Sequence, residues 1–480
     1  MYRLLSYLIL LSTSLLAQTE KMPITSKSKK ALELYYQART LNERLRPLSA
    51  QPLLQQALKL DPDFVMAQFE LTNTYNQPGP RREATLKLFE MKKTATISSA
   101  EQLFVDRLEA GFNGDNKTAD ARLAELYAKF PNDERVVMQM ALFYANKNEI
   151  SKAIELYERS IKINPDYVTV YNTLGYTYRG QGRNEDAERI FKQAIQIDPK
   201  NPNAYDSYAE LLLKLGRYEE SIKYYEKALE IESIFPSAVM GIASNLLHLK
   251  RYEESRERLN KVLSIAPNDG IRGGVHWALS VTYIDEGKFD EAVLEMTNNY
   301  NYSKKHKDNQ SMSIDLGNIS HIYFLKGDFK TAQKYNEESL QTLLRVDFSV
   351  DQKETIKKNN LPTQILHDVN LKQMESAWKK WQDFKQFAES QSNFFISRNV
   401  HNLKSLILFN ENKYAEAIDE MDLGDRWNIN NMYRRAIAYE KLGEIEKAKN
   451  EFNLIVTSRG ALNYDYSVLR HKAIEKLAAL

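Results

Sequence analysis

Residues that could support catalysis are few and widely separated in this 480-residue chain. The seven histidines are scattered, and none stands in the HExxH spacing that places two zinc ligands on one helix face. The chain contains no cysteine, which excludes thiolate catalysis, disulfides and cysteine-ligated metals. No glycine-rich loop ends in lysine followed by serine or threonine, the pattern that holds nucleotide phosphates. The residue types therefore predict no catalytic residues, no metal and no cofactor.

Two local features come nearest to a chemical site, and each has a simpler explanation. Gly270, Gly273 and Gly274 cluster, but no predicted strand precedes them, so a loop between two structural units is the better interpretation. His276 stands beside Trp277 at a position that we expect to face the core, where a structural role is the common one. We therefore expect that the protein is not an enzyme.

The composition is that of a soluble helical protein. Apolar residues make up 43% and charged residues 27% of the chain, which excludes wholesale disorder and a polytopic membrane protein. The 17 glycines and 13 prolines are about half of average usage, so helices are favoured over many-stranded sheets. The 66 basic and 64 acidic residues leave a net charge of +2, which gives no electrostatic basis for binding nucleic acid.

A sequence period of 34 residues runs through the body of the chain, and a period of this length is typical of repeat proteins. Helix-ending prolines recur at this step or its multiples, to within one residue: Pro62, Pro131, Pro165, Pro199 and Pro267. Small residues keep the same step: Ala141, Gly175, Ala209 and Ala243. Independent series in one register predict a tandem array of equal structural units.

One unit, residues 168–201, explains the spacing. Its first predicted helix carries a stripe at helical spacing: Tyr171, Leu174, Gly175 and Tyr178. Gly182 ends that helix, because a residue without a side chain readily takes the left-handed cap conformation. A second helix carries Ala187 and Phe191 on one face, and Pro199 stops it. Small Gly175 lets the two helices approach closely while Phe191 fills the space beside it.

These residues resemble the tetratricopeptide repeat family, closely over residues 134–268 and more weakly on both sides. About eleven units can be placed between residues 31 and 462. The resemblance implies an all-α fold, a right-handed superhelical solenoid of helix-turn-helix repeats. Each unit leaves an apolar face that the next unit covers.

The chain divides into five expected segments. Residues 347–370 are polar and contain Asn359, Asn360 and Pro362, so we expect a loop or hinge that interrupts the array. The last residues, from Asp465 onward, are amphipathic and are expected to cap the solenoid. The segments are a signal peptide (1–17), a flexible lead-in (18–30), an N-terminal repeat array (31–346), the loop or hinge (347–370) and C-terminal repeats with a capping helix (371–480).

The first residues have the order of a secretory signal peptide. Arg3 is followed by an apolar run of about 13 residues, and small Ala17 precedes polar Gln18. The run is shorter than the roughly 20 residues that a bilayer-spanning helix needs. We therefore expect cleavage after Ala17 and a mature chain without a stable membrane span, either periplasmic, envelope-associated or secreted.

The family resemblance implies that one face of each first helix lines a concave groove. Toward the N-terminus this face carries Tyr35, Arg39, Phe69 and Phe104. In the centre we select seven partner-binding candidates: Asn172, Tyr176, Arg179, Asp206, Glu210, Met240 and Trp277. Aromatic side chains, methionine and single charges are typical of a binding surface. Burial of some of these residues against neighbouring helices remains the alternative.

The sequence thus predicts an exported protein-binding scaffold or adaptor that holds a protein or peptide in the groove. The acidic pair Asp206 and Glu210 stands where a carboxylate-gripping groove would need cations, so that kind of adaptor is not expected. The alternative is an extracytoplasmic receptor for a peptide or a glycan stacked on Trp277 or Tyr176. The oligomeric state and the identity of the partner do not follow from the sequence.

Overall fold

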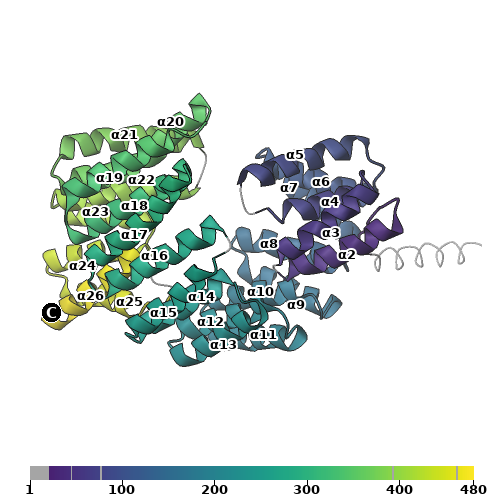
Figure 1. The fold of residues 1–480 in the computed structure, drawn as a ribbon, viewed down its shortest axis with the longest axis horizontal. Helices are drawn as coiled ribbons and strands as arrows, with labels where there is room; N and C mark the ends of the chain where they lie inside the picture. The colour runs from purple at the N-terminus through teal and green to yellow at the C-terminus, as the bar shows by residue number, and fades with distance from the viewer. Residues whose placement is uncertain (1–20, 45, 76–77, 267, 392–393, 461–462) are drawn as a thin grey trace, which may run out of the picture. The chain divides into compact units, whose positions relative to one another are not determined.

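The computed structural model describes residues 21–480 apart from 45, 76–77, 267, 392–393 and 461–462. The proposed signal peptide, residues 1–17, therefore lies outside the described residues. All secondary structure in the described part is helical, as helices α2 to α26 (Figure 1). The expected all-α fold is confirmed. The chain forms two compact units, residues 1–211 and 212–480, with the division inside α12.

The first unit contains five helix pairs and most of α12. Its helices are α2 (Lys29–Glu43), α3 (Pro47–Leu60), α4 (Val65–Thr72), α5 (Pro78–Thr94), α6 (Ser99–Phe112), α7 (Asn116–Lys129), α8 (Glu134–Asn146), α9 (Ile150–Ile163), α10 (Val168–Gly180), α11 (Asn184–Ile197) and α12 (Pro202–Lys214).

The second unit continues the same alternation to the C-terminus. Its helices are α13 (Tyr218–Ile231), α14 (Pro236–His248), α15 (Tyr252–Ser264), α16 (Asp269–Asp285), α17 (Phe289–Lys305), α18 (Asn309–Lys326), α19 (Phe329–Leu343), α20 (Val350–Asn370), α21 (Met374–Gln391), α22 (Phe394–Asn410), α23 (Tyr414–Leu423), α24 (Ile429–Lys441), α25 (Ile445–Thr457) and α26 (Tyr464–Ala479).

Each even-numbered helix from α2 to α24 is the first helix of a repeat, and the odd-numbered helix after it is the second. Close helix approach depends on small residues, as the sequence predicted. A Cβ atom at Gly175 would lie 2.5 Å from Cε1 of Phe191, and a Cβ atom at Gly241 would overlap the Tyr225 ring. The turn after α10 contains Gly182 at φ +71°, in the predicted left-handed conformation.

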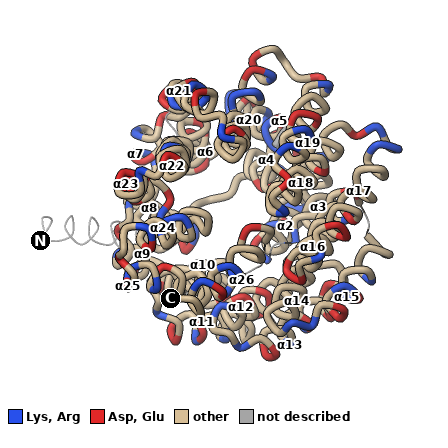
Figure 2. The backbone as a smooth tube through the Cα atoms, turned by 90° about the vertical axis from the view of Figure 1, so that its left-hand side faces the viewer, with Lys and Arg blue, Asp and Glu red and all other residues tan. Residues whose placement is uncertain are grey.

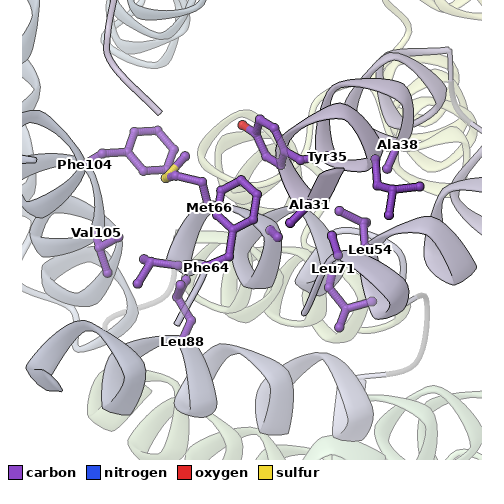
Figure 3. Packing of buried hydrophobic residues seen from close by; sticks show 14 of the residues in the cluster. Ala31, Tyr35, Ala38, Leu54, Phe64, Met66, Leu71, Leu88, Phe104 and Val105 are labelled. Atoms are coloured by element: carbon purple, nitrogen blue, oxygen red, sulfur yellow. The ribbon is translucent and has the colours of Figure 1, made fainter. Parts of the chain in front are cut away.

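The core consists of apolar clusters: one extends from α2 to α8 in the first unit, and several lie in the second unit. In the first unit, Tyr35, Phe64 and Met66 lie together between α2, α4 and the later repeats, with Phe104 on the far side of Met66 (Figure 3). The Tyr35 and Phe64 ring centroids are 5.1 Å apart. Basic and acidic residues are interspersed along the helices of both units (Figure 2), in agreement with the small net charge.

The structure corrects the loop or hinge expected over residues 347–370. This segment carries the 21-residue helix α20, which packs against α21 and forms a repeat. A capping box starts the helix, because the Ser349 hydroxyl accepts from the Gln352 amide while the Gln352 side chain accepts from the Ser349 amide. With this pair, the helices of the described part of the chain form twelve repeats before α26, where about eleven were expected.

The described part of the lead-in, residues 21–28, is also not the flexible segment that we expected. It is extended, and its backbone amides donate to carboxylates near the starts of three first helices. Met22 N donates to Asp133 at 3.0 Å, Thr25 N to Glu101 at 2.8 Å, and Lys27 N to Asp61 at 2.8 Å. These bonds hold the segment along α4, α6 and α8, whose first turns lie next to the three acids.

Candidate partner-binding surface

The central candidates lie beside the packing stripe of α10, on the face that the sequence predicted. Tyr171, Leu174 and Tyr178 are buried in the stripe, whereas Asn172 and Tyr176 are half-buried one residue further on. The same face of α12 carries Asp206 and Glu210. Because equivalent residues of consecutive repeats are 34 positions apart, Asn172 corresponds to Asp206 and Tyr176 to Glu210.

Tyr176, Arg179 and Glu210 form one polar network between α10 and α12. Arg179 Nη1 donates to Glu210 Oε1 at 2.8 Å, and the Tyr176 hydroxyl donates to Glu210 Oε2 at 2.8 Å. The Arg179 guanidinium also lies 4.5 Å from the centroid of the Tyr176 ring. Burial, followed by the charge of Glu210, raises the pKa of Tyr176 well above its usual value. Tyr176 therefore remains a hydrogen-bond donor at neutral pH.

Asp206 and Asn172 stand one helical turn before that network and remain unpaired. The Oδ1 atoms of both side chains are buried, and neither receives a hydrogen bond from the described residues. Asp206 is only 9% exposed, and burial, with a smaller contribution from Glu210, raises its pKa to about 7. Two buried hydrogen-bond acceptors, one on α10 and one on α12, thus lack a donor among the described residues.

Met240 and Trp277 belong to the second unit, so the structure does not place them with the five candidates of the first unit. Met240 is half-buried and packs against the apolar cluster of α14, α15 and α16. Trp277 is half-buried on α16, and its ring lies 5.7 Å from the ring of Tyr464 on α26. His276 next to it is 8% exposed and contacts Glu295 at 2.5 Å, in the structural position that we expected.

The C-terminal helix α26 lies on the first helices of the second unit. It packs on α25 as a cap, but it also contacts α16, α18 and α24 (Figure 1). The Tyr464 hydroxyl and Ser280 Oγ are 2.5 Å apart, and Arg470 Nη2 donates to both oxygens of Asp285 at 2.9 and 3.1 Å. The sequence predicted the cap but not this second contact, because nothing local pairs residues about 185 positions apart.

A pocket of about 380 Å³ joins the groove residues predicted near the N-terminus. Tyr35, Arg39, Phe69 and Phe104 all line it, together with residues that sequence reasoning missed: Glu43, Glu70, Arg135 and Tyr167. Arg135 donates from Nε and Nη2 to Glu43 Oε1 at 3.0 and 2.8 Å. Burial raises the pKa of Glu70 to about 7. Lys21 and Met22 of the extended N-terminal segment also line the pocket.

Within the described ranges, no group of three or more histidine, aspartate or glutamate side chains is arranged to hold a metal ion. Among the described helices, none is both long enough and apolar enough to cross a bilayer.

Family models match four segments of the chain. The model described as "Tetratricopeptide repeat" matches residues 178–230 and 212–274, and a second model of that description matches residues 431–458. The model described as "TPR repeat" matches residues 143–182. The matched segments cover α9 to α15 and most of the repeat formed by α24 and α25.

Known proteins match parts of the chain. Anaphase-promoting complex subunit CDC16 of Saccharomyces cerevisiae is 26% identical over 135 residues, which are 27% of this chain and 16% of that protein. A tetratricopeptide repeat protein from Parabacteroides merdae has 15% identity and a TM-score of 0.39 over 55% of this chain and 99% of its own. YrrB, described as a TPR protein with an unusual peptide-binding site, has 16% identity and a TM-score of 0.29 over 38% of this chain and 93% of its own.

Proposed function

The chain is a tetratricopeptide repeat protein, and from this premise we propose that it is a protein-binding scaffold. The first helices of its repeats hold a polypeptide segment of the partner. The scaffold performs no catalysis. Its specificity comes from polar side chains that lie on the first helices beside the buried packing stripes.

One observation carries the proposal: the first helices of the second unit already hold a polypeptide segment, the chain's own α26. An aromatic ring packs on Trp277, a hydroxyl pair joins Tyr464 to Ser280, and an ion pair joins Arg470 Nη2 to both oxygens of Asp285. Aromatic anchors and charge-assisted arginine pairs are contacts by which protein interfaces gain energy and orientation. The first helices therefore have the chemistry that recognition of a polypeptide requires.

Site-specific photo-crosslinking tests the scaffold proposal. A photoreactive amino acid replaces Asn172 on the first helix α10 or, as a control, Arg189 on the second helix α11. In cells that produce the protein naturally, we expect discrete crosslinked species from position 172 and none from position 189. Crosslinks of equal yield from both positions, or from neither, would contradict partner binding by the first helices.

We also propose that the scaffold is exported. The basic start, the short apolar run and the small residue Ala17 support cleavage before Gln18. Mass spectrometry of the protein purified from its native source should find an N-terminus at or near Gln18. An intact Met1 on protein from the cytoplasmic fraction would contradict export. The periplasm, the envelope surface and the medium are distinguished by fractionation of the same cells.

A pocket beside Trp277 favours a second candidate, a receptor for a small ligand. The pocket measures about 380 Å³ and is lined by Trp277, Asn299 and Asn318, with Gly273 and Gly274 as a wall without side chains. A Cβ atom at Gly274 would meet nothing within 4 Å, so packing does not require this glycine, in contrast to Gly175. An aromatic ring beside planar amides suits a sugar or another polyhydroxylated molecule.

The receptor candidate is tested by a change that fills the pocket without disturbing the fold. Gly274→Leu should leave the melting temperature unchanged or raise it, because glycine weakens a helix. If the protein binds a glycan in this pocket, Gly274→Leu abolishes that binding in a glycan array. Glycan binding that survives the substitution, or no binding by the unaltered chain, would exclude the pocket as a receptor site.

A further inference from the structure

Asp206 differs from the other buried carboxylates in the described part of the first unit. Each of the others receives a hydrogen bond or an ion pair: Asp61, Glu70, Glu101, Asp133, Glu134 and Asp198. Asp206 is 9% exposed, yet no hydrogen bond or ion pair joins it to a described residue, and its Oδ1 is buried without a donor. Burial of a carboxylate without compensation is costly, so this position calls for an explanation.

The cations and donors nearby are already engaged. Arg179 is bound to Glu210 Oε1, and the Tyr176 hydroxyl to Glu210 Oε2, so both oxygens of Glu210 have donors. Asp206 stands one turn before Glu210 on α12, which adds a like charge rather than a partner. The network between α10 and α12 therefore balances Glu210 and leaves Asp206 without a cation.

A second acceptor stands at the corresponding place on α10. Asn172 precedes Tyr176 by one turn, just as Asp206 precedes Glu210. Asn172 is 34 residues before Asp206, and Tyr176 is 34 residues before Glu210. Because Tyr176 contacts Glu210 across the two helices, the same register brings Asn172 opposite Asp206. The Oδ1 of Asn172 is also buried without a donor. Two Oδ1 acceptors that lack a hydrogen-bond donor define a subsite for a group that carries several N–H donors.

We propose that Asp206 and Asn172 form a subsite that binds the basic side chain of an arginine in the partner polypeptide. A guanidinium supplies a positive charge for Asp206 and enough N–H donors in a fixed fork to reach Asn172 at the same time. A lysine ammonium supplies the charge but not the fork, so arginine is preferred to lysine. This inference rests on the proposed scaffold function and adds the side chain that the scaffold selects.

The test uses two peptide libraries that differ in one atom-for-atom exchange. Acetylated and amidated nonapeptides carry random residues around a central arginine or around a central citrulline, which has nearly the same shape but no charge. Residues 18–480 are offered both libraries at equal concentration. We expect at least tenfold enrichment of the arginine library over the citrulline library. A third library, with a central lysine, should show a smaller enrichment over the citrulline library.

Three variants assign the preference to the subsite. Asp206→Asn should reduce the enrichment to less than twofold, and Asn172→Ala should reduce it partly. Glu185→Gln, which alters an exposed carboxylate on α11, should leave it unchanged. Circular dichroism melts verify that every variant is folded. If Asp206→Asn does not fold, the loss of enrichment in Asn172→Ala tests the subsite in its place.

The outcomes separate this inference from the scaffold proposal. Binding of both libraries with equal affinity would overturn the arginine subsite and leave the scaffold proposal standing. An arginine preference that survives in both Asp206→Asn and Asn172→Ala would overturn it in the same way. Failure of the unaltered chain to bind either library would overturn the subsite, while the crosslinks from position 172 decide separately on the scaffold.

Discussion

Asp206 makes the stability of the first unit depend on pH in a way that can be calculated. Burial, with Glu210 as the smaller cause, raises its pKa from 3.8 to about 7, so the folded protein holds the proton more tightly than the unfolded chain. The stabilisation that this group contributes is greatest below pH 3.8 and is lost as the pH rises from 3.8 to 7. The stability that is lost between these two pH values is about 4 kcal/mol at most.

We therefore predict that Asp206→Asn stabilises the protein at pH 8 by about 2–4 kcal/mol relative to the unaltered chain, with a smaller gain at pH 5. Glu70 also has a raised pKa, but it is common to both proteins and cancels in the comparison. Thermal melts at the two pH values measure the effect. An equal gain in stability at pH 5 and pH 8 would show that burial of the ionised Asp206 carboxylate does not cost stability.

Gly175 allows a controlled test of the packing between α10 and α11, because α10 contains a second glycine that serves as a control. A Cβ atom at Gly175 would lie 2.5 Å from the Phe191 ring, whereas one at Gly180 would meet nothing within 4 Å. We expect Gly175→Ala to destabilise the protein by about 1–3 kcal/mol. Gly180→Ala should be neutral or slightly stabilising, because alanine favours the helix more than glycine does. Urea unfolding of the two variants gives both values, and equal stabilities would contradict the repeat register.

The candidate residues show how far spacing alone predicts a site. The 34-residue period predicts that Asn172, Tyr176, Asp206 and Glu210 lie on matching faces, and in the structure Tyr176 contacts Glu210. The ion pair of Arg179 with Glu210 was not predictable, since a long side chain can reach several partners from one position. The contact of Trp277 with Tyr464 was not predictable either, because it depends on how far four intervening repeats turn.

At the scale of elements, α20 and α21 explain why one repeat was missed. Only the last part of α20 is buried, at Ile365, His367, Asp368 and Val369, so the helix lacks an apolar stripe over most of its length. Pro362 inside the helix is a residue that normally ends one. The turn before α21 has Lys372 at φ +63°, where six other described repeats have a glycine at positive φ and three have Asn148, Lys250 or Asn412. All three local signals of the repeat were therefore weak or absent.

The conformation of Lys372 predicts a stabilising substitution. A side chain at positive φ costs about 1–2 kcal/mol that glycine avoids. Lys372→Gly should therefore stabilise the second unit by about 1 kcal/mol, although glycine adds entropy to the unfolded chain. Lys379→Gly, at an exposed position inside α21, should instead destabilise it by about 1 kcal/mol. Thermal melts of the two variants should shift in opposite directions, and a loss of stability in both would mean that this turn is not left-handed.

At the scale of the whole molecule, α26 joins earlier and later repeats of the second unit. Its Tyr464 and Tyr466 belong to the apolar cluster of α16 to α18, whereas its Ala473 packs in the cluster of α24 and α25. Such an element makes the stability of early repeats depend on the end of the chain, whereas in an open solenoid each repeat depends only on its neighbours.

Arg470 is the residue on which this dependence can be measured. The Asp285 side chain is fully buried and receives the Arg470 guanidinium at 2.9 and 3.1 Å and the Tyr252 hydroxyl at 3.2 Å. Although burial opposes ionisation, His471 and Arg470 hold the pKa of Asp285 below its usual value. Arg470→Ala leaves this charge without its main partner, which typically costs about 3–5 kcal/mol.

We predict that Arg470→Ala increases hydrogen exchange in α14, α16 and α18, although these helices lie some 150 to 230 residues earlier in the chain. Helices α2 to α11 of the first unit should exchange as before. Lys472→Ala, an exposed position on the same helix, is the control and should change neither region. Increased exchange confined to α24, α25 and α26 would show that α26 is only a cap on the last repeat. The second unit would then be an open solenoid, and its first helices would not be held by the C-terminus.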